Sequence, residues 1–338
     1  MPDSIQMTLG GKPVILRPGE RVAQKVANAY RDTPASATAR VLAAIRNGIP
    51  WREAVRQEYA EKNPWLYHII THPDRARFIE SHPPASGSWA LDIGAGWGQI
   101  TLPLTRHCQV VAVEPTPERM DFIHAAAEQE RQHHKISFLE ASFLELELPP
   151  VFDYVCCIGV LEWVAQFHRE GSPRAVQVDF LRRIRNALRA GGRCCLGIEN
   201  RLGLKYLMGA RDDHTTLALV NTFDAHLAAK KYQALMGDEL RVFTYSLPEY
   251  QELFHEAGFT RISAYAAFPD YKLPSMILPL AEPETLNAHI LGAPLPPEHD
   301  GVDGHLLENQ KELGSTYRSL AKMGIAHYFA PSFFFLLE

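Results

Sequence analysis

The stretch Leu91-Asp92-Ile93-Gly94-Ala95-Gly96-Trp97-Gly98-Gln99 decides the fold. It closes a short apolar run, and the residues after it have the spacing of a helix. Glycines at alternate positions let the backbone turn sharply and let a ligand lie against it with no Cβ in the way. A helix that starts behind such a turn offers unpaired N–H groups to a carboxylate. The stretch therefore predicts a strand, a ligand-binding loop and a helix, in that order.

The sequence on both sides of this stretch alternates between short apolar runs and helical segments. Runs that are apolar almost throughout are typical of parallel strands buried on both faces. Strands that alternate with helices indicate a doubly wound α/β fold with a mostly parallel sheet. The expected strands are 89–93, 110–113, 136–139, 154–158, 193–198, 260–268 and 332–337, and the expected helices among them are 100–107, 117–133, 175–188 and 247–257. The last residues of the chain would thus complete the sheet.

The rest of the chain divides around this α/β region. Residues 1–85 are expected to form a helical N-terminal extension, because 20–30, 35–47 and 51–62 have apolar residues at three- and four-residue spacing and prolines separate them. Residues 86–338 form the α/β domain, with insertions at about 201–245 and 269–330. The extension and the insertions contribute no part of the predicted ligand loop. We therefore expect them to cap the carboxyl edge of the sheet and to exclude water.

Composition excludes several classes of protein. The formal net charge is −5, so no basic excess is present to hold a nucleic-acid backbone. No apolar run is long enough to span a membrane. The five cysteines, with two pairs of sequence neighbours, suggest no disulfide and favour a reduced, cytoplasmic chain. The cysteines lack the spacing of a zinc or iron–sulfur site, and the acids and histidines are scattered, so the sequence predicts no metal.

Further polar residues follow the next strands at their carboxyl ends, where open α/β sheets bind ligands. Glu114 ends the second strand, and a carboxylate there can accept both hydroxyls of a ribose. Residues 140–143 and 157–163 follow the third and fourth strands. The glycine spacing differs from GxGxxG, since position 99 is Gln, which speaks against a dinucleotide. The acidic Asp92 before the glycines instead suits a ligand with an ammonium or sulfonium group.

The combination of DxGxGxG, an acid after the second strand and the run Phe152-Asp-Tyr-Val-Cys-Cys-Ile-Gly-Val-Leu-Glu-Trp-Val164 resembles the class I S-adenosylmethionine-dependent methyltransferases over about residues 86–200. The resemblance implies a Rossmann-like, seven-stranded sheet and S-adenosylmethionine as cofactor. It implies that Asp92, Gly94, Gly96 and Gly98 hold the methionine end and that Glu114 holds the ribose. The adenine end would lie against Ser142, Phe143 and Ile158, with Phe143 packed on the ring. Ser142 stands where the family often has Asp.

A narrower resemblance concerns bacterial methyltransferases associated with cell-envelope glycan or secondary-metabolite biosynthesis. It rests on residues 63–68, on GVLEWV at 159–164 and on the IENR motif that begins at Ile198. This subgroup implies a small-molecule or glycan acceptor and gives little on its identity. The oligomeric state stays open, with a homodimer as one option.

The candidate residues for binding the methyl acceptor follow the fourth and fifth expected strands. Glu162 and Trp163 either contact the acceptor or begin a helix and fill the core. Glu199, Asn200 and Arg201 either orient the acceptor or close a turn. His214, with Asp213 fixing its ring, and His168 are the rival candidates for a general base, and a polar loop is the plainer interpretation of 212–214.

The sequence therefore predicts a methyltransferase that acts on O or N of a small polar metabolite, natural product or glycan. Two classes remain as alternatives: a nicotinamide-dependent oxidoreductase, and a non-catalytic S-adenosylmethionine-binding protein of the same fold. Transfer of a different group from the same cofactor also stays open.

Overall fold

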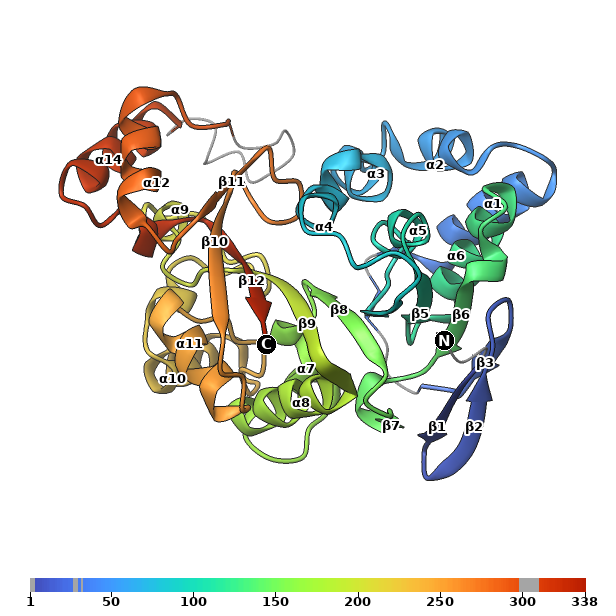
Figure 1. Ribbon diagram of the computed structural model, residues 1–338. Coiled ribbons are helices and arrows are strands. Elements are labelled where there is room, and N and C mark those ends of the chain that lie inside the picture. The colour runs from blue at the N-terminus through green and yellow to red at the C-terminus, as the bar shows by residue number, and fades with distance from the viewer. Residues whose placement is uncertain (1–3, 27–29, 32, 298–309) are drawn as a thin grey trace. The chain divides into compact units, whose positions relative to one another are not determined.

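The structure is a computed structural model that describes residues 4–26, 30–31, 33–297 and 310–338 (Figure 1). The chain folds into two compact units. The first contains Met1–Ile158 and Arg182–Cys195, and the second contains Gly159–Leu181 and Leu196–Glu338. This division is not the one expected from the sequence, which placed a boundary at residue 85.

The first unit is built on parallel strands in the order β8-β4-β5-β6-β3, and β9 lies beside β8. In register, Ile93 at the end of β4 is opposite Val113 of β5 and Cys157 of β8, so three carboxyl ends lie level. Every residue of β4 and β6 is buried. The strands are β3 (Arg21–Ala23), β4 (Trp89–Ile93), β5 (Gln109–Val113), β6 (Ile136–Glu140), β8 (Phe152–Ile158) and β9 (Leu188–Glu199), the last belonging to this unit as far as Cys195.

Helices from the N-terminal region share the core of this unit. Buried side chains of α1, α2 and α3 form one apolar cluster with α6, with β5 and β6, and with Trp97 of the glycine loop. The edge of the Trp51 ring meets the Phe122 ring at 5.8 Å between centroids. These N-terminal helices are therefore part of the core of the first unit. The helices are α1 (Ala35–Arg46), α2 (Trp51–Tyr59), α3 (Pro64–Thr71), α4 (Arg77–Ser81), α5 (Thr101–Leu104) and α6 (Pro117–Gln129).

The helix predicted over residues 20–30 is wrong for residues 20–26, and residues 27–29 lie outside the described residues. Arg21–Ala23 forms β3 at the edge of the sheet, parallel to β6. The backbone of Glu20 accepts from Phe138 N–H, and Gln24 N–H donates to Glu140. Unpaired groups on the edge of β6 are thereby satisfied, which outweighs a weak local helical pattern. Upstream, β1 (Ile5–Leu9) and β2 (Lys12–Leu16) form an antiparallel hairpin, and β7 (Leu146–Glu147) pairs with β1 (Figure 1).

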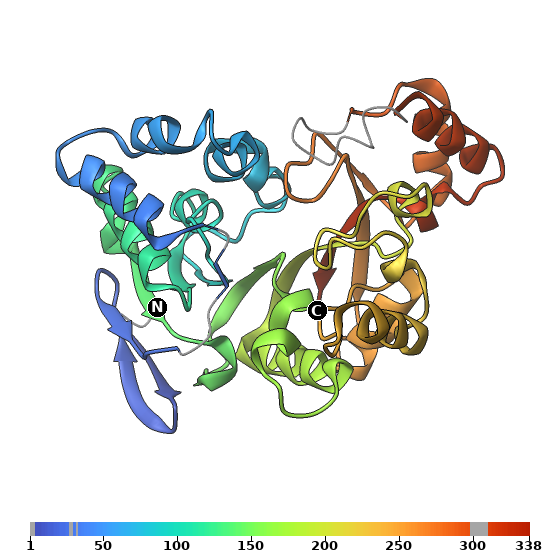
Figure 2. The ribbon, with the colours of Figure 1, turned by 180° about the vertical axis from the view of Figure 1, so that it is seen from behind.

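The second unit has strands in the order β11-β10-β12-β9, with β10 antiparallel to both neighbours. Figure 2 shows the dark red β12 beside the orange β10 from behind. The strands are β10 (Ile262–Phe268), β11 (Met276–Pro279), β12 (Ser332–Leu337) and β9 from Leu196 onward. The helices are α7 (Val164–Phe167), α8 (Pro173–Ala187, shared with the first unit), α9 (Leu204–Leu207), α10 (Ala225–Met236), α11 (Leu247–Glu256), α12 (Pro283–Gly292) and α14 (Gln310–Lys322).

The fold is α/β with a large, mostly parallel sheet, as predicted. The expected final strand is β12, whose six residues are all buried. To the seven expected strands of this sheet the described residues add β3 and β11, and β1, β2 and β7 form a separate small sheet. Strand β11 was predicted to lie in an insertion, and it pairs instead with β10 because that strand would otherwise form an open edge. Every helix in the described ranges is too short or too polar to traverse a lipid bilayer.

Candidate functional site

The glycine loop after β4 has a backbone that favours glycine at all three alternate positions. Gly94, Gly96 and Gly98 have φ of +68°, +57° and +77°, in the left-handed region. A Cβ on Gly98 would lie 3.3 Å from Cγ1 of Ile123, so this position is also crowded. On Gly96 the nearest atom would be 3.5 Å away, which leaves the backbone conformation as its main constraint. The loop is thus a tight turn, and the backbone N–H groups of residues 94–98 are all hydrogen-bonded within the protein.

Glu114, directly after β5, is hydrogen-bonded to this loop. Its Oε2 accepts the N–H of Gly96 at 2.9 Å, and its Oε1 accepts the N–H of Thr116 at 2.9 Å. The residue is 2% exposed, and burial raises the pKa of its carboxyl, while Arg119 and the two N–H groups act in the opposite direction. Each carboxylate oxygen keeps a further lone pair for a ligand hydroxyl.

Asp92 is a second buried carboxylate beside the loop. Thr101 Oγ1 donates to Asp92 Oδ2 at 2.6 Å. Burial raises the pKa of Asp92 to about 7, and the charge of Glu114 adds to the shift, while Thr101 and Arg75 act in the opposite direction. Two desolvated carboxylates with raised pKa values are stabilised in their charged forms by a cation. This part of the site therefore fits a positively charged ligand.

The remaining predicted cofactor residues lie at the ends of β6 and β8 in the same unit. Ser142 is half-buried and precedes the short turn Phe143–Glu145. Phe143 and Ile158 are each 6% exposed. Sequence reasoning missed Thr101 and Arg119. Arg119 is 8% exposed with its guanidinium 5.1 Å from the ring centre of Tyr30, and no local sequence signal marks either residue.

In the second unit, predicted acceptor residues gather around one histidine. Glu162 lies in the turn Leu161–Trp163, Glu199 ends β9, and His214 follows α9; their side chains are 1%, 1% and 5% exposed. His214 Nε2 lies 3.8 Å from Glu162 Oε1 and 3.7 Å from Glu199 Oε2. The Trp163 ring meets the His214 ring edge-on at 5.2 Å. We call Glu162, Glu199 and His214 the acid–histidine cluster.

The partners of His214 differ from the prediction. Asp212 orients the ring: its Oδ1 is 3.2 Å from Nδ1, and Thr215 N–H donates to its Oδ2. Asp213 instead accepts from Lys272 Nζ at 2.9 Å. Burial opposes a charge on His214, but the carboxylates of Glu199, Asp212 and Glu162 outweigh it and raise the pKa of the imidazole well above its usual value.

Lys272 links this cluster to a wider group of charges. Its Nζ donates to Glu199 Oε1. Burial raises the pKa of Glu199, although Lys272 and His214 favour its charged form. The side chain of Lys205 is 3% exposed, and its Nζ lies 3.9 Å from Asp213 Oδ2 and 3.8 Å from Asp270 Oδ2.

Asn200 and Arg201 hold protein structure. Asn200 Nδ2 donates to the carbonyls of residues 328 and 330, and its Oδ1 accepts from the N–H of residue 202. Arg201 pairs with Glu249 through two bonds of 2.6 and 2.9 Å and also donates to the carbonyls of residues 222 and 223. These contacts match the turn-closing interpretation. The other candidate base, His168, is half-buried at the end of α7, where its carbonyl accepts from Arg241 Nη2 at 3.3 Å.

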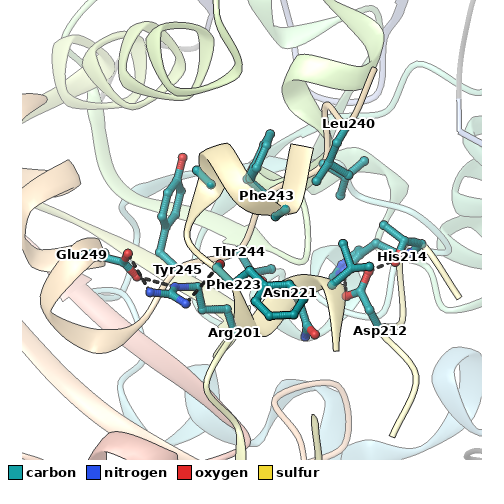
Figure 3. Close-up of a pocket in the computed structure, with 15 residues that line it drawn as sticks. Arg201, Asp212, His214, Asn221, Phe223, Leu240, Phe243, Thr244, Tyr245 and Glu249 are labelled. Atoms are coloured by element: carbon teal, nitrogen blue, oxygen red, sulfur yellow. Dashed lines mark hydrogen bonds and ion pairs between the residues drawn. The ribbon is translucent and has the colours of Figure 1, made fainter. Parts of the chain in front are cut away.

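A pocket of about 450 Å³, including its open mouth, lies in this unit beside His214 (Figure 3). The His214–Asp212 pair and the Arg201–Glu249 pair stand on opposite sides of it in the figure. Both polar atoms of the Asn221 carboxamide are buried without a hydrogen-bond partner among the described residues. The pocket thus offers polar groups together with apolar walls. It is lined by Arg201, Asp212, His214, Thr215, Val220, Asn221, Phe223, Ala225, Ala228, Leu240, Val242, Phe243, Thr244, Tyr245 and Glu249.

Comparison with known proteins gives one family and a set of solved structures. Residues 91–194 match the family described as Methyltransferase domain. No curated protein matches the chain. One similar structure is a candidate O-methyltransferase of Nostoc punctiforme, with 15% identity, TM-score 0.42, and 70% of this chain and 66% of that chain covered. Another is phosphoethanolamine N-methyltransferase 2 of Haemonchus contortus with S-adenosyl-L-methionine, with 16% identity, TM-score 0.45, and 84% and 59% covered.

A third similar structure is a Thermotoga maritima methyltransferase described as a possible histamine N-methyltransferase, with 15% identity, TM-score 0.42, and 67% and 91% covered. The chain spans 66% and 59% of the length of the first two structures. The family match begins at Leu91 and includes the glycine loop and Glu114. Over residues 91–194 the chain is therefore similar to a methyltransferase domain, and the similar Haemonchus contortus structure contains S-adenosyl-L-methionine.

Proposed function

We propose that this chain transfers a methyl group from S-adenosylmethionine to O or N of a small polar metabolite, natural product or glycan. The observation that carries the proposal is the pair of buried carboxylates, Asp92 and Glu114, on either side of a glycine loop. Their burial raises both pKa values, so a cationic ligand would stabilise them. S-adenosylmethionine supplies an ammonium and a sulfonium group. A nicotinamide dinucleotide would bring an anionic pyrophosphate to the same place, and for this reason we rank the oxidoreductase second.

Each part of the cofactor has a proposed partner. Asp92 and the three loop glycines would hold the methionine end, with Asp92 facing its ammonium group and the glycines letting it lie close to the backbone. Glu114 would accept the ribose hydroxyls on the lone pairs that Gly96 and Thr116 leave free. Ser142, Phe143 and Ile158 would contact the adenine, with Phe143 packed against the ring.

The chemistry is an in-line displacement at a methyl group that the bound cofactor supplies in activated form. The acceptor's lone pair forms the new bond while the sulfur keeps the electrons of the old one. The protein's part is to position the acceptor and to exclude water. We propose Glu162, Trp163 and Glu199 for acceptor contacts. Asn200 and Arg201 would support them by fixing the turn after β9.

A hydroxyl acceptor also loses a proton, which a histidine could take. The carboxylates around His214 favour its protonated form, and a protonated ring cannot accept a proton. We therefore place His168 ahead of His214 as the proposed base, with His214 as an acceptor-site residue. The cap role of residues 1–85 and of the two insertions, the bacterial subgroup, a cytoplasmic location and a homodimer stay predictions.

Calorimetric titration of the full chain with S-adenosylmethionine, S-adenosylhomocysteine and NAD tests the cofactor. We expect binding of the first two, with affinity lost in Asp92→Ala and Glu114→Ala. The control is Glu128→Gln, an exposed acid on α6 of the same unit. Binding of NAD alone, or unchanged affinity in both site variants, would contradict the proposal. Formation of S-adenosylhomocysteine with a panel of amines, alcohols and glycans then identifies the acceptor class.

A further inference from the structure

The acid–histidine cluster has the spacing of a metal site. In the described part of the chain, Glu162, Glu199 and His214 are the one group of acids, histidines or cysteines whose ligand atoms could hold an ion, all within 4.8 Å of one another. The distances of 3.8 and 3.7 Å from His214 Nε2 to the two carboxylates are too long for hydrogen bonds. Ligand atoms bound to one ion at about 2.1 Å lie roughly 3.0 to 3.6 Å apart. Small movements of the three side chains toward one another would therefore bring their ligand atoms to the separations found around a bound ion.

Unsatisfied carboxylate oxygens give an independent indication of a ligand. Glu162 Oε2 and Glu199 Oε2 are buried and have no hydrogen-bond partner among the described residues. Both side chains are 1% exposed, so water does not reach them freely. A buried acceptor without a partner carries a desolvation cost that a bound cation removes. Glu199 Oε2 is also the oxygen that faces His214, while Lys272 occupies Oε1.

The orientation of the imidazole is the one that metal-bound histidines have. The Asp212 carboxylate can only accept, so the 3.2 Å contact assigns a proton to Nδ1 of His214. In the neutral ring the lone pair is then on Nε2, which faces Glu162 and Glu199. Thr215 N–H holds Asp212 in place at 2.8 Å. A carboxylate behind the ligating histidine fixes its tautomer and its direction.

The charges around the cluster leave room for a cation. The network of described ion pairs contains five carboxylates, three of which pair with the ammonium groups of Lys205 and Lys272, while the other two pair with His214. Five negative charges against two ammonium groups leave the network short of two positive charges when the imidazole is protonated and of three when it is neutral. The five carboxylates are Glu162, Glu199, Asp212, Asp213 and Asp270.

We propose that Glu162, Glu199 and His214 bind one divalent transition-metal ion, with two carboxylate oxygens and Nε2 as protein ligands. This donor set suits Zn²⁺ or Mn²⁺. Three protein ligands leave at least one coordination position open, as in catalytic sites. His214 also lines the pocket of Figure 3, so a hydroxyl or carboxylate oxygen of a molecule there is the ligand class we assign to the open position. That last step rests on the proposed function, whereas metal binding does not.

The proposal departs from the prediction of no metal made from sequence spacing. Glu162, Glu199 and His214 come from a turn, a strand end and a loop that are far apart in the chain. Spacing along the sequence therefore carries no signal of the site. Only the fold of the second unit brings the three side chains together.

The test uses the full chain, stripped with a chelator and then titrated with ZnCl₂ and MnCl₂ without cofactor or acceptor. We expect one equivalent of at least one ion to bind and to raise Tm, since a ligand of the native state stabilises it. Glu162→Gln and His214→Gln should each lower the affinity by about 100-fold or more, and Asp212→Asn by about 10- to 100-fold. The control is Glu256→Gln, a partly exposed acid on α11 of the same unit, which should bind as the wild type does.

Circular dichroism and cooperative thermal unfolding of the metal-free variants serve as the folding control, because the altered residues lie in the second unit and the proposed cofactor residues in the first. If Glu162→Gln or His214→Gln does not fold, Asp212→Asn together with the visible absorption of the Co²⁺-loaded protein decides the case. Less than about a tenth of an equivalent of either ion with no change in Tm overturns the site. Equal affinity in wild type and ligand variants overturns it as well. Failure of cofactor binding alone would contradict the proposed function and leave the metal site standing.

Discussion

Glu114 Oε2 accepts the backbone N–H of Gly96 at 2.9 Å, so the end of β5 and the loop after β4 are joined by a hydrogen bond. The left-handed φ of Gly96 is part of this turn. A group proposed to bind the ribose thus also holds the loop proposed to bind the methionine end. The two parts of the proposed cofactor site are therefore positioned relative to one another before a ligand binds, which lowers the entropic cost of binding.

This double role of Glu114 predicts different results for two substitutions. In Glu114→Ala, the N–H groups of Gly96 and Thr116 lose their acceptor, and we expect a loss of stability of about 1 to 3 kcal/mol together with loss of cofactor binding. Glu114→Gln keeps one acceptor oxygen and should lose less stability. Urea denaturation and calorimetric titration measure the two effects. Equal stability of Glu114→Ala and wild type would show that the hydrogen bond to the loop contributes nothing.

Asp92 predicts a specific dependence of stability on pH. Its pKa is about 7 in the folded chain and near the ordinary aspartate value when unfolded, so the native state binds more protons between these values. Its contribution is therefore fully present below about pH 4 and is lost as the pH rises to about 7. We expect Asp92→Asn, which cannot ionise, to gain stability relative to wild type as the pH rises from about 5 to about 8.

Denaturation of the cofactor-free protein across this pH range measures the difference in unfolding free energy between wild type and Asp92→Asn. The contributions of other titrating groups, Glu114 among them, cancel in this comparison where the substitution leaves their surroundings unchanged. A difference that does not change with pH would mean that Asp92 has an ordinary pKa. The same variant should bind S-adenosylmethionine weakly, so stability and proposed function would change in opposite directions.

Gly98 and Gly191 form a matched pair of glycines in the first unit. Both have a φ of +77°, but a Cβ on Gly98 would lie 3.3 Å from Ile123, whereas a Cβ on Gly191 meets nothing within 4 Å. Both alanine variants bear the backbone strain of about 1 to 2 kcal/mol, and Gly98→Ala adds crowding at Ile123. We expect Gly98→Ala to be the less stable of the two and to bind the cofactor more weakly. Equal thermal denaturation of the two variants would contradict this.

The local features of the fold could be predicted from the sequence. The strand, turn and helix around residues 91–99 are specified by neighbouring residues, and Glu114 is marked by its place at the end of the next apolar run. β3 could not be predicted, since a three-residue strand has no periodicity, and Arg21 pairs with Phe138 from a distant part of the chain. Pairing of this kind depends on the open edge of β6, which exists only in the folded sheet.

Side-chain roles at the strand ends were harder to predict than the strands. Glu199, Asn200 and Arg201 are adjacent polar residues, yet Asn200 and Arg201 are engaged by carbonyls and by Glu249, while Glu199 faces His214. Residue type and position suggest a site for all three equally. What separates them is the partner that each side chain meets, and those partners come from distant segments of the second unit.

Substitution of Trp51 tests whether the N-terminal helices are part of the core of the first unit or a separable extension. The residue is 5% exposed, its ring meets Phe122 edge-on, and its Nε1 donates to Glu130 at 2.9 Å. Because α2 shares a core with α6, we expect Trp51→Ala to cost about 3 to 5 kcal/mol of unfolding free energy. Ile15→Ala, at a half-exposed position of the β1–β2 hairpin, is the control and should cost little.

Chemical denaturation of the two variants decides between the roles. A loss of unfolding free energy below about 1 kcal/mol for Trp51→Ala would mean that the core does not depend on these helices. That result would fit a detachable cap. The predicted large loss would mean that deleting residues 1–80 unfolds the first unit instead of only changing acceptor use. In that case a cap role has to be tested with substitutions on the exposed faces of α1–α3, since these leave the shared core in place.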